Sequence, residues 1–71
     1  MKQRSEFSQR LQKLRKRRRM NRKALGELCR LNKSTVSRYE RGERVPDINI
    51  AIKLADVFDV SLDYLCGHEK K

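Results

Sequence analysis

The apolar residues at the start of the chain recur with the period of an α-helix. Phe7, Leu11 and Leu14 fall at i, i+4 and i+7, so they share one helical face. Ser5 precedes this stripe, where its hydroxyl can cap the helix by accepting a first-turn N–H. The cluster RKRRR (residues 15–19) falls in the last turn, where cations complement the helix dipole. The pattern predicts a first helix that packs by its apolar face.

Three later segments begin in the same way, with an apolar residue, a capping residue, and a second apolar residue at the N4 position. The two apolar residues form a hydrophobic staple, which fixes where a helix begins. The pattern therefore predicts a second helix over residues 22–29, a third that starts at Lys33, and a fifth over residues 62–66 that ends at Gly67. The staples are Met20-Asn21-Leu25, Leu31-Asn32-Val36 and Val60-Ser61-Leu65.

A fourth helix is expected to begin near Asp47, directly after Pro46. Its polar positions form one narrow stripe, and nearly all the other positions are apolar. A helix with this pattern is mostly buried, so it is predicted to be the core of the domain. The apolar positions are Ile48, Ile50, Ala51, Ile52, Leu54, Ala55, Val57 and Phe58.

The second and third helices are separated by only Arg30 and Leu31 before the cap of the third. Helices joined this tightly must cross at a large angle, which is the arrangement of a helix-turn-helix. Gly26 lies in the middle of the second helix, where glycine costs about 1 kcal/mol relative to alanine, so we expect the next helix to approach closely there. The second helix is expected to bury Leu25, Leu28 and Cys29.

The third helix lies in the segment NKSTVSRYERGERVP (residues 32–46), which is poor in apolar residues. Val36 and Tyr39 point to one side of a helical wheel, with Glu40 beside them. The opposite side carries hydrogen-bond donors and small hydroxyls and no carboxylate. Such a face suits base edges in a DNA major groove, where lysine or arginine bonds guanine and serine bonds several partners. Its residues are Lys33, Ser34, Ser37 and Arg38.

The charge of the chain is distributed unevenly. The 71 residues carry a formal net charge of +10. Residues 1–44 hold 16 lysines and arginines against four acids, whereas residues 45–71 hold three lysines against five acids. This asymmetry indicates that the chain meets a polyanion on one side. Arg22, Arg41 and Arg44 stand at helix ends or in loops, where they could contact phosphates.

The sequence excludes several other classes of protein. Catalysis finds no support, because His68 is the only histidine and no Cys/His pair, carboxylate dyad or glycine-rich phosphate loop is present. Cys29 and Cys66 have no metal-ligand spacing and are expected to be small hydrophobes in a reducing cytosol. No cofactor, small-molecule effector, membrane span or secretory signal is evident. We therefore expect a cytoplasmic protein, associated with the nucleoid through DNA.

Two alternatives to a protein whose main role is DNA binding remain open at this point. Arginine-rich helices bind RNA, but the aromatic residues are needed for packing, which leaves no platform for stacking bases. The other alternative is an antitoxin or protein-interaction module that binds DNA only for autoregulation. Recovery of a stoichiometric protein partner would favour that second alternative.

The run STVSRYERGERVP…IAIKLADVFDVSLDYL resembles the Cro/C1-type (XRE) helix-turn-helix family of phage repressors and small bacterial regulators. The resemblance covers roughly residues 5–67 and implies one all-α domain over residues 1–71, with a compact, five-helix, lambda-repressor-like fold. It also implies a homodimer that binds double-stranded DNA and regulates transcription, and we expect a repressor on a palindromic operator.

The resemblance also assigns roles to particular residues. It implies that the third helix enters the major groove and that Arg15 pairs with Glu40, which closes this helix. The implied base contacts are Lys33, Ser34, Ser37 and Arg38. The implied phosphate contacts are Asn21, Arg22, Arg41 and Arg44.

Three arginines depart from the pattern of the family. Arg22 replaces the usual glutamine at the start of the second helix, and Arg19 and Arg30 replace the usual glycines before and after that helix. All three substitutions add positive charge near the expected DNA backbone. We therefore expect phosphates to contribute more of the affinity than is usual in the family, with a steep dependence on salt.

The dimer interface is expected in the acidic, apolar-rich C-terminal part. One short recognition helix reads few base pairs, and a two-fold pair with half-sites about one turn apart multiplies specificity. The residues expected at this interface are Val60, Leu62, Tyr64 and Leu65.

Overall fold

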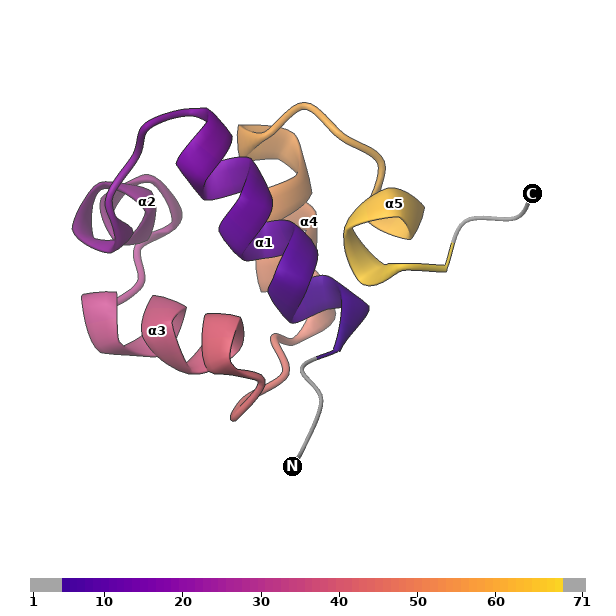
Figure 1. The fold of residues 1–71 in the computed structure, drawn as a ribbon, viewed down its shortest axis with the longest axis horizontal. Coiled ribbons are helices and arrows are strands. Elements are labelled where there is room, and N and C mark those ends of the chain that lie inside the picture. The colour runs from indigo at the N-terminus through magenta and orange to yellow at the C-terminus, as the bar shows by residue number, and fades with distance from the viewer. Residues whose placement is uncertain (1–4, 69–71) are drawn as a thin grey trace.

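A computed structural model of the chain describes residues 5–68, which form helices and no strand (Figure 1). The five helices are α1 (Glu6–Arg17), α2 (Arg22–Cys29), α3 (Lys33–Arg41), α4 (Ile48–Val57) and α5 (Leu62–Cys66). The predicted all-α fold and the order of its elements are confirmed. Within residues 5–68, no helix is both long enough and apolar enough to cross a membrane.

Side-chain caps begin four of the five helices. The Asn21 side chain accepts a hydrogen bond from the Ala24 N–H at 2.7 Å, and the Asp47 side chain accepts one from the Ile50 N–H at 2.9 Å. Ser5 and Ser61 cap α1 and α5 in the same way. Asn32 occupies the N-cap position of α3, as expected, but its side chain makes no capping hydrogen bond.

One hydrophobic core joins all five helices. α1 crosses the molecule and contacts both α3 and α5, while α2 packs on α3 and α4 (Figure 1). Each helix contributes at least one side chain that is buried from water. The buried residues of this core are Phe7, Leu11, Leu14, Leu25, Cys29, Val36, Tyr39, Leu54, Ala55, Phe58 and Leu65.

The turn between α2 and α3 has the geometry that the sequence predicts. A Cβ added at Gly26 would lie 2.4 Å from the carbonyl oxygen of Leu31, so only glycine allows this approach. Arg30 has φ 58° and ψ 43°, the left-handed conformation that favours glycine. The two helices therefore meet in a helix-turn-helix, and Arg30 adopts a strained conformation to form it.

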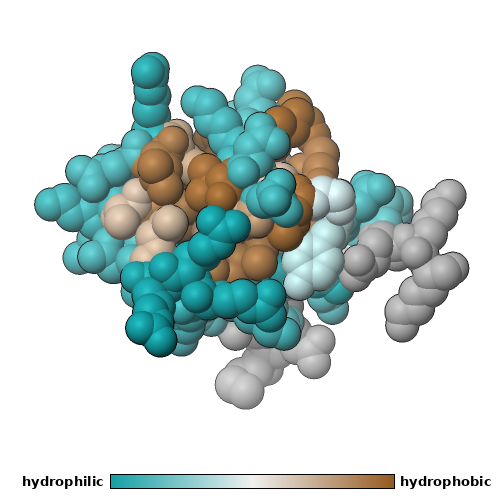
Figure 2. Space-filling view, turned by 90° about the horizontal axis from the view of Figure 1, so that it is seen from above, coloured by the Kyte–Doolittle hydropathy of each residue, from teal (hydrophilic) through white to brown (hydrophobic). Residues whose placement is uncertain are grey.

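Two predictions of burial are wrong. The side chains of Ile48 and Ile52 in α4 are 60% and 44% exposed, and Leu28 in α2 is 60% exposed. α4 packs on α2 and α5, and in a domain this small no further element covers its remaining side. Figure 2, seen from the side where α1 ends, also shows apolar side chains at the surface, surrounded by hydrophilic ones.

Candidate nucleic-acid interface

Few apolar side chains hold α3 against the rest of the protein, but they are deeply buried. Val36 and Tyr39 are 0% and 1% exposed. The ring of Tyr39 meets the ring of Phe7 edge to face, with centroids 6.0 Å apart. The Ser8 hydroxyl donates a hydrogen bond to the backbone oxygen of Tyr39 at 2.6 Å. These contacts to α1 fix the rotation of α3 about its axis, and hence which of its residues face water.

The face of α3 that points away from the core carries the four predicted base-contacting residues. Lys33, Ser34 and Arg38 are exposed, and Ser37 is half-buried. The only carboxylate of the helix, Glu40, is 1% exposed. The accessible surface of α3 therefore offers hydrogen-bond donors and hydroxyls, with no side-chain anion to repel a nucleic acid.

Glu40 is the centre of a buried ion-pair network. Its carboxylate accepts hydrogen bonds from Nε of Arg15 at 2.6 Å and from Nη2 of Arg15 at 3.1 Å, which confirms the expected pair. Nε of Arg22 also donates to Glu40, at 3.1 Å. Arg15 further donates to the carbonyl oxygen of Met20 at 2.8 Å. The network therefore connects α1, the start of α2 and the end of α3.

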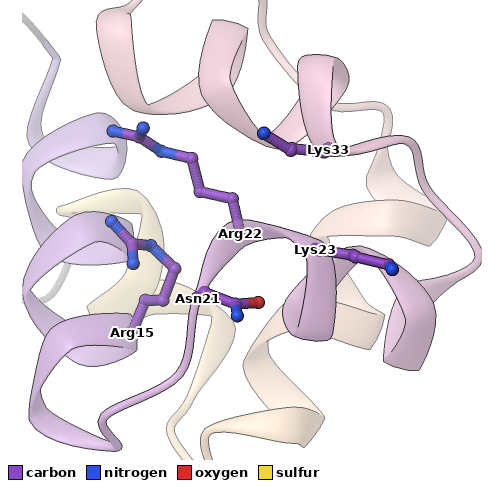
Figure 3. A pocket seen from close by; sticks show the side chains of 5 residues that line it. All are labelled: Arg15, Asn21, Arg22, Lys23 and Lys33. Atoms are coloured by element: carbon purple, nitrogen blue, oxygen red, sulfur yellow. The ribbon is translucent and has the colours of Figure 1, made fainter.

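A basic pocket of about 360 Å³ opens beside this network. Figure 3 shows the Arg22 side chain extending from the start of α2 toward α1 and the Lys33 side chain pointing from the start of α3 into the same space, while the Lys23 side chain points away. The pocket brings Lys33, predicted to contact bases, together with two residues predicted to contact phosphates. Its lining residues are Arg15, Asn21, Arg22, Lys23 and Lys33.

Sequence reasoning missed Lys23 and the partner of Arg22. Lys23 lies at the second position of α2, next to the N-cap, and its place in the first turn could have identified it. The pairing of Arg22 with Glu40 could not be read from the helical pattern, because the two residues come from different helices. The departure from the glutamine usual in the family was the only indication that position 22 differs here.

The loop after α3 carries both predicted phosphate contacts of this region. Nε of Arg41 donates to Oε2 of Glu43 at 2.8 Å, and Nη2 donates to Oε1 at 3.1 Å. The hydrogen bond from Arg41 holds the pKa of the Glu43 carboxyl below its usual range. Arg44 is exposed and forms no ion pair within the described part of the chain. Arg44 therefore presents a more open positive charge than Arg41.

Part of the RKRRR cluster has a structural role. Arg18 donates to the carbonyl oxygen of Phe58 at 3.1 Å and lies over its ring, with 5.9 Å from the guanidinium carbon to the ring centroid. Arg15 is engaged with Glu40. Arg19 has φ 53°, in the left-handed region. The remaining exposed cations of the cluster can contribute to the field around the domain.

The predicted dimer surface needs one correction. Leu65 is 0% exposed and belongs to the core, because the short α5 buries this side chain under α1 and α4. Val60, Leu62 and Tyr64 are half-buried and accessible. The Arg10 guanidinium lies over the Tyr64 ring, with 4.5 Å from its carbon to the ring centroid.

A second concavity of about 320 Å³ is largely apolar and lies between the start of α1 and the start of α4. None of the residues predicted to bind DNA lines it. It contains the exposed apolar residues that precede and begin α4, including Val45 and Ile48, which are 85% and 60% exposed.

The two cysteines are free and differ in their exposure to solvent. Cys29 is buried and Cys66 is exposed. Burial raises the pKa of the Cys29 thiol, and the nearby Lys53 opposes this effect. Among residues 5–68, no group of three or more histidine, cysteine or acidic side chains could hold a metal ion.

Comparisons with known proteins find relatives that share the helix-turn-helix. A sequence model described as helix-turn-helix matches residues 11–65. The chain is 39% identical over 62 residues to the HTH-type transcriptional regulator AnsR of Bacillus subtilis, covering 87% of this chain and 53% of the relative. It is 32% identical over 64 residues to the HTH-type transcriptional regulator ImmR of the same organism, covering 90% of this chain and 50% of the relative. The chain thus spans about half the length of the curated relatives it matches.

Among similar solved structures, two superpose on nearly the whole chain. A transcriptional regulator from Listeria innocua superposes with a TM-score of 0.87 at 32% identity, covering 97% of this chain and 64% of that chain. The P22 c2 repressor protein, in complex with a synthetic operator, superposes with a TM-score of 0.85 at 25% identity, covering 96% of this chain and 100% of that chain.

Proposed function

The chain belongs to the Cro/C1-type helix-turn-helix family, and from this premise we propose that it is a transcriptional regulator that binds double-stranded DNA. In this proposal α3 lies in the major groove and the protein acts as a dimer on a palindromic operator. Repression is the proposed mode of action, because a repressor bound to a synthetic operator is among the similar structures. The proposed activity implies a cytoplasmic location, at the nucleoid.

The observation that carries the proposal is the division of α3 into two faces. Its apolar residues and its only carboxylate are buried, while Lys33, Ser34 and Arg38 are exposed. Donors and small hydroxyls on an otherwise bare helix match the acceptor-rich edges of bases in the major groove. An ordinary solvated helix face would be expected to expose acidic as well as basic side chains, whereas the exposed face of α3 has no acidic one.

The proposed contacts divide between bases and backbone. Base edges are contacted by α3, and phosphates are contacted at the start of α2 and in the loop after α3. Phosphate contacts position the protein and base contacts give specificity. The proposed base contacts are Lys33, Ser34, Ser37 and Arg38, and the proposed phosphate contacts are Asn21, Arg22, Arg41 and Arg44.

The proposed dimer uses the accessible part of the C-terminal region, namely Val60, Leu62 and Tyr64. Sedimentation of the free protein at micromolar concentration tests this assembly, and a mass near twice that of the chain is expected. If the free protein is a monomer and pairs only when duplex is added, dimerisation occurs on the DNA.

Selection of bound sequences from a random duplex pool tests the proposed function. A consensus with two-fold symmetry is expected, with half-sites about one helical turn apart. Enrichment of sequences without any consensus would contradict sequence-specific binding and leave only polyanion binding. No enrichment over beads alone would contradict DNA binding altogether.

A further inference from the structure

The buried carboxylate of Glu40 accepts hydrogen bonds from two arginines, Arg15 and Arg22. One carboxylate faces two guanidinium groups, so the cluster retains a net positive charge. Glu40 is 1% exposed, whereas the side chain of Arg22 is 38% exposed. The excess charge therefore reaches the surface through Arg22, which also lines the basic pocket.

The hydrogen bond to Glu40 constrains how Arg22 presents its remaining donors. A guanidinium is a planar fork with five N–H donors, so fixing the Nε–H direction fixes the plane of the other four. Nε of Arg22 lies 3.1 Å from Oε1 of Glu40. An arginine held in one geometry loses less conformational entropy when it binds a phosphate than a mobile surface arginine does.

The surroundings of Arg22 fit a single phosphate group. The backbone N–H groups in the first turn of a helix attract anions. The Asn21 side chain is bonded to the Ala24 N–H, so it does not cap the N–H groups of Arg22 and Lys23. Lys33 lines the same pocket from α3, and its side chain points into the space beside Arg22 (Figure 3). A phosphate between Arg22 and Lys33 would relieve the repulsion between them.

From these contacts we propose that Glu40 is a positioning residue for DNA binding. It holds the Arg22 guanidinium in the pose that binds a backbone phosphate in the pocket between α2 and α3. Through Arg15 and its bond to the Met20 carbonyl it also fixes the segment that leads into α2. The inference rests on the proposed function, since its ligand is a DNA phosphate.

The salt dependence of DNA binding separates positioning from a purely structural role. Each phosphate neutralised contributes about −0.9 to the slope of log K against log salt. We expect Arg22→Ala to make the slope shallower by about 0.9 per monomer, and Glu40→Gln to make it shallower by about the same amount. The double variant is expected to lose no more slope than Arg22→Ala alone. The probe is a 20-base-pair duplex carrying the selected consensus, or a mixed-sequence duplex if none is selected.

Glu27→Gln is the matched control, because it removes a negative charge from an exposed residue of α2 that is not among the proposed contacts to DNA. Removal of a negative charge by itself strengthens the attraction to DNA. If Glu40 had only a structural role, Glu40→Gln would therefore leave the slope of log K against log salt unchanged or make it steeper. That result for Glu40→Gln would overturn the proposal that Glu40 positions Arg22. A double variant with a shallower slope than Arg22→Ala alone would overturn it as well. If the unsubstituted protein binds neither duplex, the proposed function fails rather than the role of Glu40 within it.

A second measurement on the unsubstituted protein keeps the test valid if Glu40→Gln does not fold. The Nε–H proton of Arg22 is expected to give its own nitrogen-15 NMR signal, protected from exchange in the free protein. Added duplex is expected to shift this signal. An Arg22 signal that exchanges as fast as those of exposed arginines would contradict the pre-positioned pose.

Discussion

α3 and α4 use apolar residues in opposite ways. α3 has few apolar side chains, and Val36 and Tyr39 are both buried completely or nearly so. α4 is mostly apolar, yet Ile48 and Ile52 remain 60% and 44% exposed. The number of apolar residues in a helix therefore did not decide how firmly it is held. α3 packs on α1 and α2, and α4 packs on α2 and α5, so the number of neighbouring helices is the same. What differs is whether the apolar side chains of the helix lie on the side that those neighbours cover.

The same difference explains why the polar helix can carry the function. Two deep anchors and a network centred on Glu40 fix α3, which leaves its outer face without any structural task. α4 contributes Ala51, Leu54 and Ala55 to the core, and its exposed polar side chains form one narrow stripe that includes an acid, Asp56. A helix that is held by few residues can vary the others, and this is what a helix that reads base edges requires.

The largest expected effect tests the anchors of α3 against the exposed residues of α4. Tyr39→Ala removes a buried aromatic ring, and we expect a loss of about 3–5 kcal/mol of unfolding free energy. Ile48→Ala removes a side chain that already faces water, so we expect a loss below about 1 kcal/mol. Urea denaturation followed by circular dichroism measures both. Equal losses would mean that apolar content, rather than coverage, determines stability.

A smaller effect is expected at two positions with left-handed backbone, one shortly before α3 and one shortly after α4. Arg30 has φ 58° and precedes α3, and Asp59 has φ 54° and follows α4. Glycine relieves the strain at such positions, so we expect Arg30→Gly to stabilise the fold by about 1 kcal/mol and Asp59→Gly by less, since aspartate tolerates this conformation.

DNA binding distinguishes these two glycine variants. Arg30→Gly also removes a charge near the proposed DNA backbone, so its affinity for duplex is expected to fall. Asp59→Gly removes a charge of the opposite sign away from α3 and is expected to preserve the affinity. Thermal unfolding and fluorescence anisotropy with labelled duplex measure the two effects. If Arg30→Gly binds duplex with unchanged affinity, the prediction that phosphate contacts contribute much of the affinity is contradicted.

The smallest expected effect concerns pH. Burial raises the pKa of the Tyr39 hydroxyl; the nearby Arg44 opposes the shift and Asp47 adds to it. Because the folded pKa lies above the unfolded one, the contribution is fully present below the unfolded value, about 10, and is lost as the pH rises through the folded value. Tyr39→Phe is expected to lose less stability than the original protein between neutral pH and pH 11. Parallel profiles in urea titrations would contradict this cause.

The sequence predicted the helices well because their signals are local. Caps such as Ser5, Asn21 and Asp47 lie within three residues of the N–H groups that they accept from, so short patterns identify them. Gly26 predicted a close approach that the Leu31 carbonyl makes. The exposure of Leu28 and Ile52 could not be predicted in this way, because it depends on which sides of the helices other elements cover.

The residues of the proposed site could be predicted from the sequence, but the contacts between residues of different helices could not. The helical wheel of α3 separates Val36 and Tyr39 from Lys33 and Arg38, and the structure has the same two faces. The pairing of Arg22 with Glu40 depends on the relative position of α2 and α3, which no local pattern contains. The same holds for Leu65, which helical spacing alone could not distinguish from an interface residue.

One comparison tests the central claim, that the exposed face of α3 reads DNA, most directly. Arg38→Ala and Lys53→Ala each remove one exposed cation, from α3 and α4 respectively. For the duplex enriched by selection, we predict that Arg38→Ala weakens binding by about tenfold to a hundredfold, the equivalent of roughly 1–3 kcal/mol for a contact of this type. Lys53→Ala is predicted to change binding less than about twofold, since salt screens charges that lie away from the interface. Equal losses for the two variants would contradict the account.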